Sequence, residues 1–153
     1  MAKKFIRVIS DFNSESLSVF LKHELAADEF DFEVAPFQQV YQTLSSATSS
    51  WADIVWTAPE RTLPSFKRAL QLEQTSHEDV LAEVEDFANS IIKASENRYL
   101  FFAAWVLPPV SGYGMLDWKD GVGLHNLLAK CNLRFAEKIS VSSNIFMLPS
   151  LFS

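Results

Sequence analysis

The sequence predicts an α/β domain in which helices cover both faces of a mainly parallel five-stranded sheet, forming a three-layer αβα sandwich. Short runs rich in β-branched and aromatic residues alternate along the chain with stretches whose apolar residues recur at helical spacing. Five such alternations indicate right-handed strand–helix–strand units, which build parallel sheets. The 153 residues suit one domain, so we expect residues 1–153 to form a single α/β unit.

Five segments have the composition of β-strands and are bounded by polar or turn-forming residues. They are Lys4–Ser10, Phe30–Phe37, Ala52–Pro59, Arg98–Pro108 and Asn144–Pro149. The second alternates apolar and acidic residues, which is typical of a strand with one face in water, so we expect it at an edge of the sheet. The fourth is almost entirely apolar and is expected to be buried on both faces.

Between the strands, apolar residues recur every three or four positions, as on the buried face of a helix. Helices are expected within residues 17–25, 40–44, 63–73, 76–92 and 124–139. The fourth has the clearest start, because Asp79 follows Ser76 by three residues in an approximate capping box. Cys131 lies on the apolar stripe of the last helix, so we expect a buried core thiol.

Five strands connected in this way favour the flavodoxin-like order 2-1-3-4-5. In such sheets ligands bind outside the carboxyl ends of the strands, where the order reverses between the first and third strands. This rim would contain Ser10–Asn13, Thr57–Arg61 and the loop Pro108–Gly123. A functional site is therefore expected there.

Composition excludes several classes of function. The net charge of −6 argues against nucleic-acid binding, which needs a basic face. The single cysteine allows no intrachain disulfide, and the histidines have no metal-ligand spacing, so no metal site is expected. No apolar run reaches the ~18–20 residues of a membrane span, and no signal peptide precedes Asp11. We expect a cytoplasmic protein.

Three residues have the order that serine hydrolases of the SGNH type require. Ser10 follows the first strand, and Asp120 and His125 stand just before the last helix. In such an enzyme the serine oxygen attacks the substrate, the histidine accepts its proton, and the aspartate orients the imidazole. Thr57 and Asn13 are candidate hydrogen-bond donors to the oxyanion.

The details of this hydrolase pattern depart from the expected one. Phe12 occupies the position at which a Gly-Asp-Ser turn would hold the nucleophile, and Asp120 and His125 are five residues apart rather than three. Ser10 and Asp11 therefore have an alternative interpretation as turn and capping residues, and His125 as a side chain of the first helical turn.

Two further rim residues are candidates for binding. Trp118 lies in a glycine-rich loop, where it is the best candidate for an exposed aromatic anchor. Arg61 follows the third strand and, with Lys67 and Arg68, forms a small basic group in an otherwise acidic chain.

Several longer strings together resemble the sequence of the N-terminal domain of FkbH-like proteins. The resemblance covers essentially all 153 residues. The strings are VISDFN, APFQQVYQTL, DIVWTAPERTLPSFKRAL, HEDVLAEVEDFA, WVLPP, GYGMLDW and CNLRFAEKI. Full-length members of that family have an SGNH-like α/β domain followed by a phosphatase domain of the haloacid dehalogenase (HAD) superfamily, subclass IIIC. The resemblance implies that this chain is the N-terminal part of a longer protein.

The resemblance implies that the chemistry of the family belongs to the HAD domain. That domain transfers a glyceryl unit to an acyl carrier protein in polyketide-type biosynthesis. The HAD domain has an Asp-x-Asp-x-Thr string and binds Mg²⁺. This chain contains no such string, so the resemblance transfers no catalytic residue and implies no cofactor here.

The interpretation that we prefer is a non-catalytic recognition or scaffold domain that helps to dock the carrier protein. Carrier proteins are acidic, so docking would use the local basic group of Arg61, Lys67 and Arg68. Two alternatives stay open at this point. One is an SGNH-type esterase that uses Ser10, His125 and Asp120, and the other is a structural domain for oligomerisation. The sequence leaves the oligomeric state undetermined.

Overall fold

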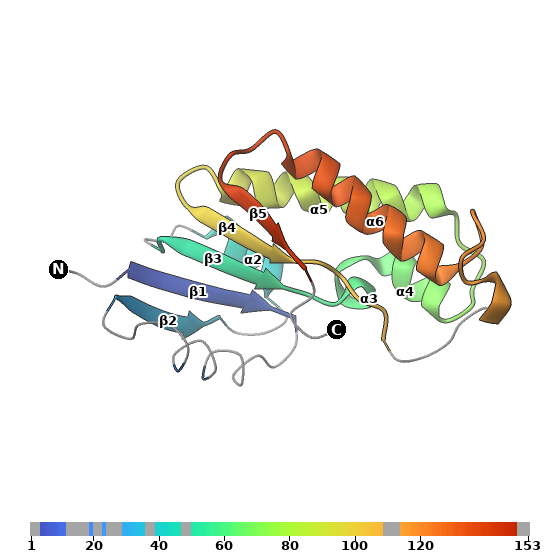
Figure 1. Cartoon of the computed structure of the whole chain (residues 1–153), viewed down its shortest axis with the longest axis horizontal. Coiled ribbons are helices and arrows are strands. Elements are labelled where there is room, and N and C mark those ends of the chain that lie inside the picture. The colour runs from blue at the N-terminus through green and yellow to red at the C-terminus, as the bar shows by residue number, and fades with distance from the viewer. Residues whose placement is uncertain are drawn as a thin grey trace.

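The five strands lie side by side in the order β2-β1-β3-β4-β5, and every neighbouring pair is parallel (Figure 1). They are β1 (Lys4–Ser10), β2 (Phe30–Val34), β3 (Ala52–Trp56), β4 (Tyr99–Ala103) and β5 (Ile145–Leu148). The predicted α/β fold and its strand order are confirmed, and β2 is an edge strand as expected. The computed structural model describes residues 4–11, 19, 23, 29–35, 39–46, 50–108 and 114–149.

Five α-helices, together with a 3-10 turn at Gly114–Leu116, connect these strands in the described part of the chain. They are α2 (Val40–Ser45), α3 (Pro59–Thr62), α4 (Pro64–Leu70), α5 (His77–Ala94) and α6 (Leu124–Ile139). Of the helix expected within residues 17–25, only Val19 and His23 are described, and both are helical. None of the described helices is both long enough and apolar enough to cross a membrane.

All strands after β1 end earlier than the sequence predicts, and the structure gives the reason for β3 and β4. β3 ends at Trp56, and Pro59 begins the short helix α3, because proline in a first helical turn gives up no hydrogen bond. β4 ends at Ala103, since the side chain of Asn132 occupies both backbone groups of Trp105. Trp105 N–H donates to Asn132 Oδ1 at 3.0 Å, and Asn132 Nδ2 donates to the Trp105 carbonyl at 3.0 Å.

The main hydrophobic core lies on one face of the sheet, beneath α2, α4, α5 and α6. The helices supply apolar stripes, and the sheet supplies Ile9, Val55, Leu100, Phe102 and Ile145. Aromatic rings fill its centre: Phe102 stacks on Phe135, with ring centroids 4.1 Å apart. Cys131 is buried in this core, as predicted, and burial raises the pKa of its thiol to about 12.

A buried group of charges joins β1, β3 and the start of β4. Asp53 is fully buried and accepts hydrogen bonds from Arg7 Nε at 3.2 Å and Arg7 Nη2 at 2.9 Å. Arg98 Nε lies 2.9 Å from the same carboxylate, and Ser50 Oγ donates to it at 2.8 Å. Because Arg7 and Asp53 are register partners, this group fixes the alignment of β1 with β3.

Candidate functional site

The candidate site lies where β1 and β3 end, at the expected switch point of the sheet. Ser10 and Trp56 are register partners at the last positions of the two strands. Asp11 follows Ser10 directly, and the segment from Thr57 to α3 follows Trp56. In parallel α/β sheets this position collects the loops that bind ligands.

Asp11 ties these two loops together. Its carboxylate accepts hydrogen bonds from Ala58 N–H, at 3.0 Å to Oδ1 and 3.2 Å to Oδ2, and from Thr62 Oγ1 at 3.1 Å. Ala58 is the residue before the first turn of α3, so the carboxylate of Asp11 holds the beginning of that helix in place. The side chain predicted to lie on the rim thus has a structural role there.

Burial changes the acidity of this carboxyl group. Asp11 is 5% exposed, and desolvation raises its pKa above the usual value of 3.8, against the opposite effect of the hydrogen bonds from Ala58 and Thr62. Asp11 therefore holds its proton to a higher pH than an aspartate in water.

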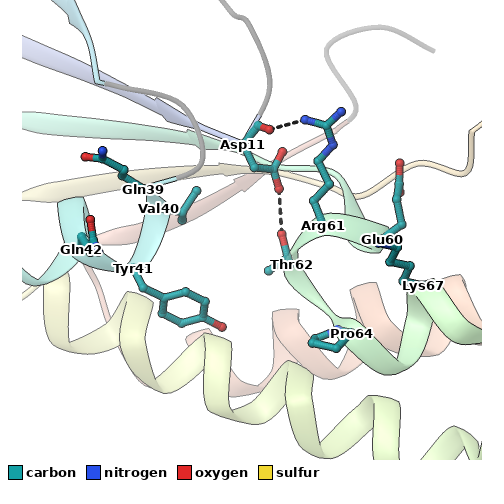
Figure 2. A pocket seen from close by; sticks show the side chains of 10 residues that line it. All are labelled: Asp11, Gln39, Val40, Tyr41, Gln42, Glu60, Arg61, Thr62, Pro64 and Lys67. Carbon is teal, nitrogen blue, oxygen red and sulfur yellow. Dashed lines mark hydrogen bonds between the residues drawn. The ribbon is translucent and has the colours of Figure 1, made fainter.

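Arg61 is brought to the same point by α3. Its Nη1 donates a hydrogen bond of 2.5 Å to the backbone carbonyl of Asp11, while the side chain remains exposed. Figure 2 shows the guanidinium group beside Asp11, with further nitrogens free of that contact. The structure therefore brings together two of the rim residues that the sequence predicts, Asp11 and Arg61.

A cleft of about 840 Å³ opens beside them, between α2 on one side and α3 and α4 on the other (Figure 2). It is lined by Asp11, Gln39, Val40, Tyr41, Gln42, Glu60, Arg61, Thr62, Pro64 and Lys67. The wall therefore combines two cations, two amides and one aromatic ring with two carboxyl groups, those of Asp11 and Glu60. One oxygen of the Glu60 carboxylate, Oε2, is buried and has no hydrogen-bond partner among the described residues.

The wall formed by α2 is the part of the site that sequence reasoning missed. Gln39, Tyr41 and Gln42 reach the cleft because α2 follows the edge strand β2 and returns across β1 toward β3. The strand order 2-1-3, which the sequence predicts, already indicates such a wall, because the connection from β2 to β3 must pass over β1.

Thr57 and Ser10 also lie at the strand ends, and both are buried. Thr57 Oγ1 accepts a hydrogen bond of 3.0 Å from the indole Nε1 of Trp105, so this hydroxyl anchors a core aromatic side chain. Asn13, the second predicted oxyanion donor, and Phe12 lie outside the described residues.

The other predicted catalytic residues surround the start of α6. Asp120 is exposed and pairs with Lys130 Nζ, whose hydrogen bond lowers the pKa of Asp120 below the usual range. The His125 ring stacks on Trp118, with centroids 5.0 Å apart and planes at 14°. Trp118 itself is 69% exposed. Asp120 thus pairs with Lys130, and His125 stacks on Trp118. A catalytic Ser10–His125–Asp120 triad stays a prediction.

No family model and no curated protein matches the chain. Among solved structures, it is similar to the N-terminal part of the protein BF1531 from Bacteroides fragilis, which contains a phosphatase domain complexed with Mg, at a TM-score of 0.73 and 14% identity. The match covers 99% of this chain and 41% of that one, so this chain spans less than half of the neighbour's length.

A second solved structure, the native aryl esterase of M. smegmatis, matches at a TM-score of 0.55 and 11% identity. That match covers 95% of this chain and 83% of the esterase. At such identities both neighbours show a shared fold. The chain therefore shares its fold with an aryl esterase and with the N-terminal part of a phosphatase-containing protein.

Proposed function

We propose that this chain is a non-catalytic recognition domain of an FkbH-like protein, and that its cleft binds the phosphopantetheine arm of an acyl carrier protein. One observation carries the proposal. Asp11 and Thr57, which follow the two strands where a hydrolase of this fold places reacting groups, are engaged in contacts that hold α3 and Trp105. The cleft beside them presents groups suited to binding instead.

The lining of the cleft matches the chemistry of such an arm, which has a phosphodiester followed by a hydroxyl and two amides. Arg61 and Lys67 provide cations for the phosphate, and Arg makes the stronger, directional hydrogen bonds. The side-chain amides of Gln39 and Gln42 can donate to and accept from the amide groups of the arm.

The surface around the cleft suits an acidic partner. Arg61, Lys67 and Arg68 are all exposed on α3 and α4, where they form a local basic patch on a chain of net charge −6. Opposite charges across an interface guide association and orient the two partners. The fold of the BF1531 neighbour supports the wider setting, because there the same fold belongs to a longer, phosphatase-containing protein.

Calorimetric titration with a carrier protein in its phosphopantetheinylated and unmodified forms tests the proposal. We expect the modified form to bind more tightly, and the double variant Arg61→Glu, Lys67→Glu to weaken binding by about tenfold or more, since a hydrogen bond to a charged group contributes roughly 1.5–3 kcal/mol. Lys119→Glu is the control, because Lys119 is exposed outside the cleft. Equal binding of the two forms, or equal losses in the control, would refute the role of the cleft.

The second candidate function is that of an SGNH-type esterase, favoured by the shared fold with the aryl esterase and by the position of Ser10 at the end of β1. Hydrolysis of a short acyl ester such as p-nitrophenyl acetate tests it. Activity that Ser10→Ala and His125→Ala both abolish would replace the recognition function with this one.

A further inference from the structure

A second pocket, of about 610 Å³, opens at the edge of the sheet where the strands begin, at the other end from the candidate site. Its wall comes from the ends of α2 and α5 and from the turn that precedes β4. Most of its polar lining consists of Ser45, Ser46, Ser90, Lys93, Asn97 and Arg98. We call this space the rear pocket. Among the described residues, it shares only Tyr41 with the lining of the cleft.

The rear pocket adjoins a buried group of charges that does not balance. The side chains of Arg7 and Arg98 are each 8% exposed, and both pair with the fully buried carboxylate of Asp53. No other described acid forms an ion pair with either arginine. Two buried guanidinium groups thus share one carboxylate, and the group has one positive charge in excess. A buried charge is costly unless an opposite charge compensates it.

Arg98 is the guanidinium with N–H groups left over. Arg7 directs Nε and Nη2 at Asp53, and its Nη1 donates to Ser46 Oγ at 3.4 Å. Arg98 Nη2 donates to the carbonyl of Leu44 at 3.1 Å. Arg98 Nε is buried, and although it lies 2.9 Å from Asp53 Oδ2, it makes no hydrogen bond of good geometry with the described residues. Arg98 is also the arginine that lines the rear pocket.

The rest of the lining adds a second cation and an amide. Lys93 lies in the last turn of α5, Asn97 lies in the turn before β4, and both are exposed. The three serines have small side chains, and their hydroxyl groups donate to the carbonyls of Gln42, Thr43 and Asp86 in their own helices. The serines therefore leave the space open, while Arg98, Lys93 and Asn97 supply the donors.

The helix ends beside the pocket do not cancel these cations. The last carbonyl groups of a helix carry partial negative charge, which would repel an anion where they are bare. Here the carbonyls of Ile91, Ile92 and Lys93 at the end of α5 accept the N–H groups of Ser95 and Glu96. At the end of α2, Arg98 itself caps one carbonyl.

We propose that the rear pocket binds the phosphate group of a small phosphorylated molecule, through Arg98, Lys93 and Asn97. A phosphate group has up to two negative charges and three acceptor oxygens, so it compensates the buried excess and uses all three donors. The pocket has the size of a small-molecule site and therefore has room for the rest of the ligand. Glu96, which also lines it, can accept a hydrogen bond from a hydroxyl group of that ligand.

This inference goes beyond the proposed function, because the rear pocket contains neither Arg61 nor Lys67. Titrations with inorganic phosphate and with ribose 5-phosphate, followed by ¹H–¹⁵N NMR at constant ionic strength, test it. We expect saturable shifts of the amides of residues 44–46 and 93–98, and tighter binding of the ester. Acetate at the same ionic strength should not produce them, because a carboxylate has only two oxygens.

Lys93→Glu should weaken binding of both phosphates by about tenfold or more, and Asn97→Ala by about threefold, because each removes one donor. Both residues are exposed, so both variants should fold. The matched control is Lys119→Glu, an exposed lysine outside the pocket, which should change binding less than about twofold. The cleft variant Arg61→Glu, Lys67→Glu should keep the shifts at residues 93–98, which separates this site from the cleft.

Four results would each overturn the inference. They are the absence of saturable shifts at residues 93–98, equal binding by wild type and Lys93→Glu, equal shifts with acetate, and binding of free phosphate that ribose 5-phosphate does not share.

Discussion

At the scale of single residues, the buried charge of Asp53 depends on neighbouring side chains to compensate it. Its carboxylate is fully buried, and the guanidinium groups of Arg7 and Arg98 supply the charges that compensate it. Burying an ion pair costs much of what the pair gains, but removing one partner leaves the other charges uncompensated. The group is therefore more important for alignment of the strands than for net stability.

We expect Asp53→Ala to lower the free energy of unfolding by about 3–5 kcal/mol, because two buried guanidinium groups lose their counter-ion. Urea unfolding followed by circular dichroism measures this loss. The control is Glu85→Ala, which removes the partly exposed pair with Arg134 and should cost at most about 1 kcal/mol. Similar losses in the two variants would contradict the assignment.

Asp11 gives a pH-dependent prediction. Because burial raises its pKa, the folded state holds the proton to a higher pH than the unfolded chain does. The contribution of Asp11 is therefore most favourable below pH 3.8 and declines as the pH rises through the folded-state pKa. The stability of the wild type relative to Asp11→Asn should fall over this window and then level off. Urea unfolding at closely spaced pH values measures it, and a difference that rises with pH would show that the pKa is lowered.

The place of the candidate site at the ends of β1 and β3 follows from the sequence, whereas the contacts of its residues do not. The partners of Asp53, Arg7 and Arg98, are distant in sequence. Nothing in the local sequence therefore distinguishes the buried Asp53 from an exposed acid. Asp11 is similar: its partners, Ala58 and Thr62, come 47 and 51 residues later and meet it only in the folded sheet.

At the scale of elements, the start of α6 depends on the close packing of one turn. Gly123 precedes the helix, and a Cβ atom added there would lie 1.9 Å from the carbonyl oxygen of Asp117. That same carbonyl accepts a hydrogen bond of 3.0 Å from Asn126 N–H. The backbone of this turn is therefore packed against the first turn of α6, and only glycine fits between them.

We expect Gly123→Ala to destabilise the protein by about 3 kcal/mol or more, since the clash is with backbone that cannot move aside. Gly121→Ala is the matched control in the same turn. Gly121 has a φ of 78° and nothing within 4 Å of an added Cβ, so that change costs only the backbone strain, about 1–2 kcal/mol. Thermal unfolding of the two variants compares them, and equal losses would contradict the packing argument.

Element boundaries were harder to predict than the elements themselves. The apolar pattern predicts a strand through Pro108, yet β4 ends at Ala103 because Asn132, from a distant helix, binds the backbone of Trp105. The same limit applies to α3: Pro59 can end a strand or begin a helix, and the contact with Asp11 decides between them.

At the scale of the whole molecule, the two faces of the sheet differ in how completely they are covered. Phe102 points into the main core and is 0% exposed, whereas its neighbour Phe101 points to the opposite face of the sheet and is half-buried. Alternation along a strand thus places the same residue type in two environments at adjacent positions.

Phe102→Ala should therefore lower the free energy of unfolding by about 3–5 kcal/mol, as expected for a large cavity in a closed core. Phe101→Ala should cost about half as much or less, because solvent already reaches part of its ring. Chemical unfolding of the two variants gives the comparison directly. Equal costs would mean that the ring of Phe101 is as well covered as the ring of Phe102.

The global fold could be predicted because its signals repeat along the chain: five alternations of strand and helix are enough to indicate a parallel sheet. The cover of the second face could not be predicted, because it depends on which residues share a register row. Phe101 and Phe146 are 45 residues apart in sequence, and only strand pairing brings them together.

The shortness of β5 limits where another polypeptide can attach to this side of the molecule. The unpaired backbone N–H and C=O groups of an edge strand can pair with a strand of another molecule and so extend the sheet. β5 has only four residues, and Pro149, which has no backbone N–H group, follows it at once. This protects the edge against aggregation by strand addition. A foreign strand therefore finds few backbone groups with which to pair at this edge.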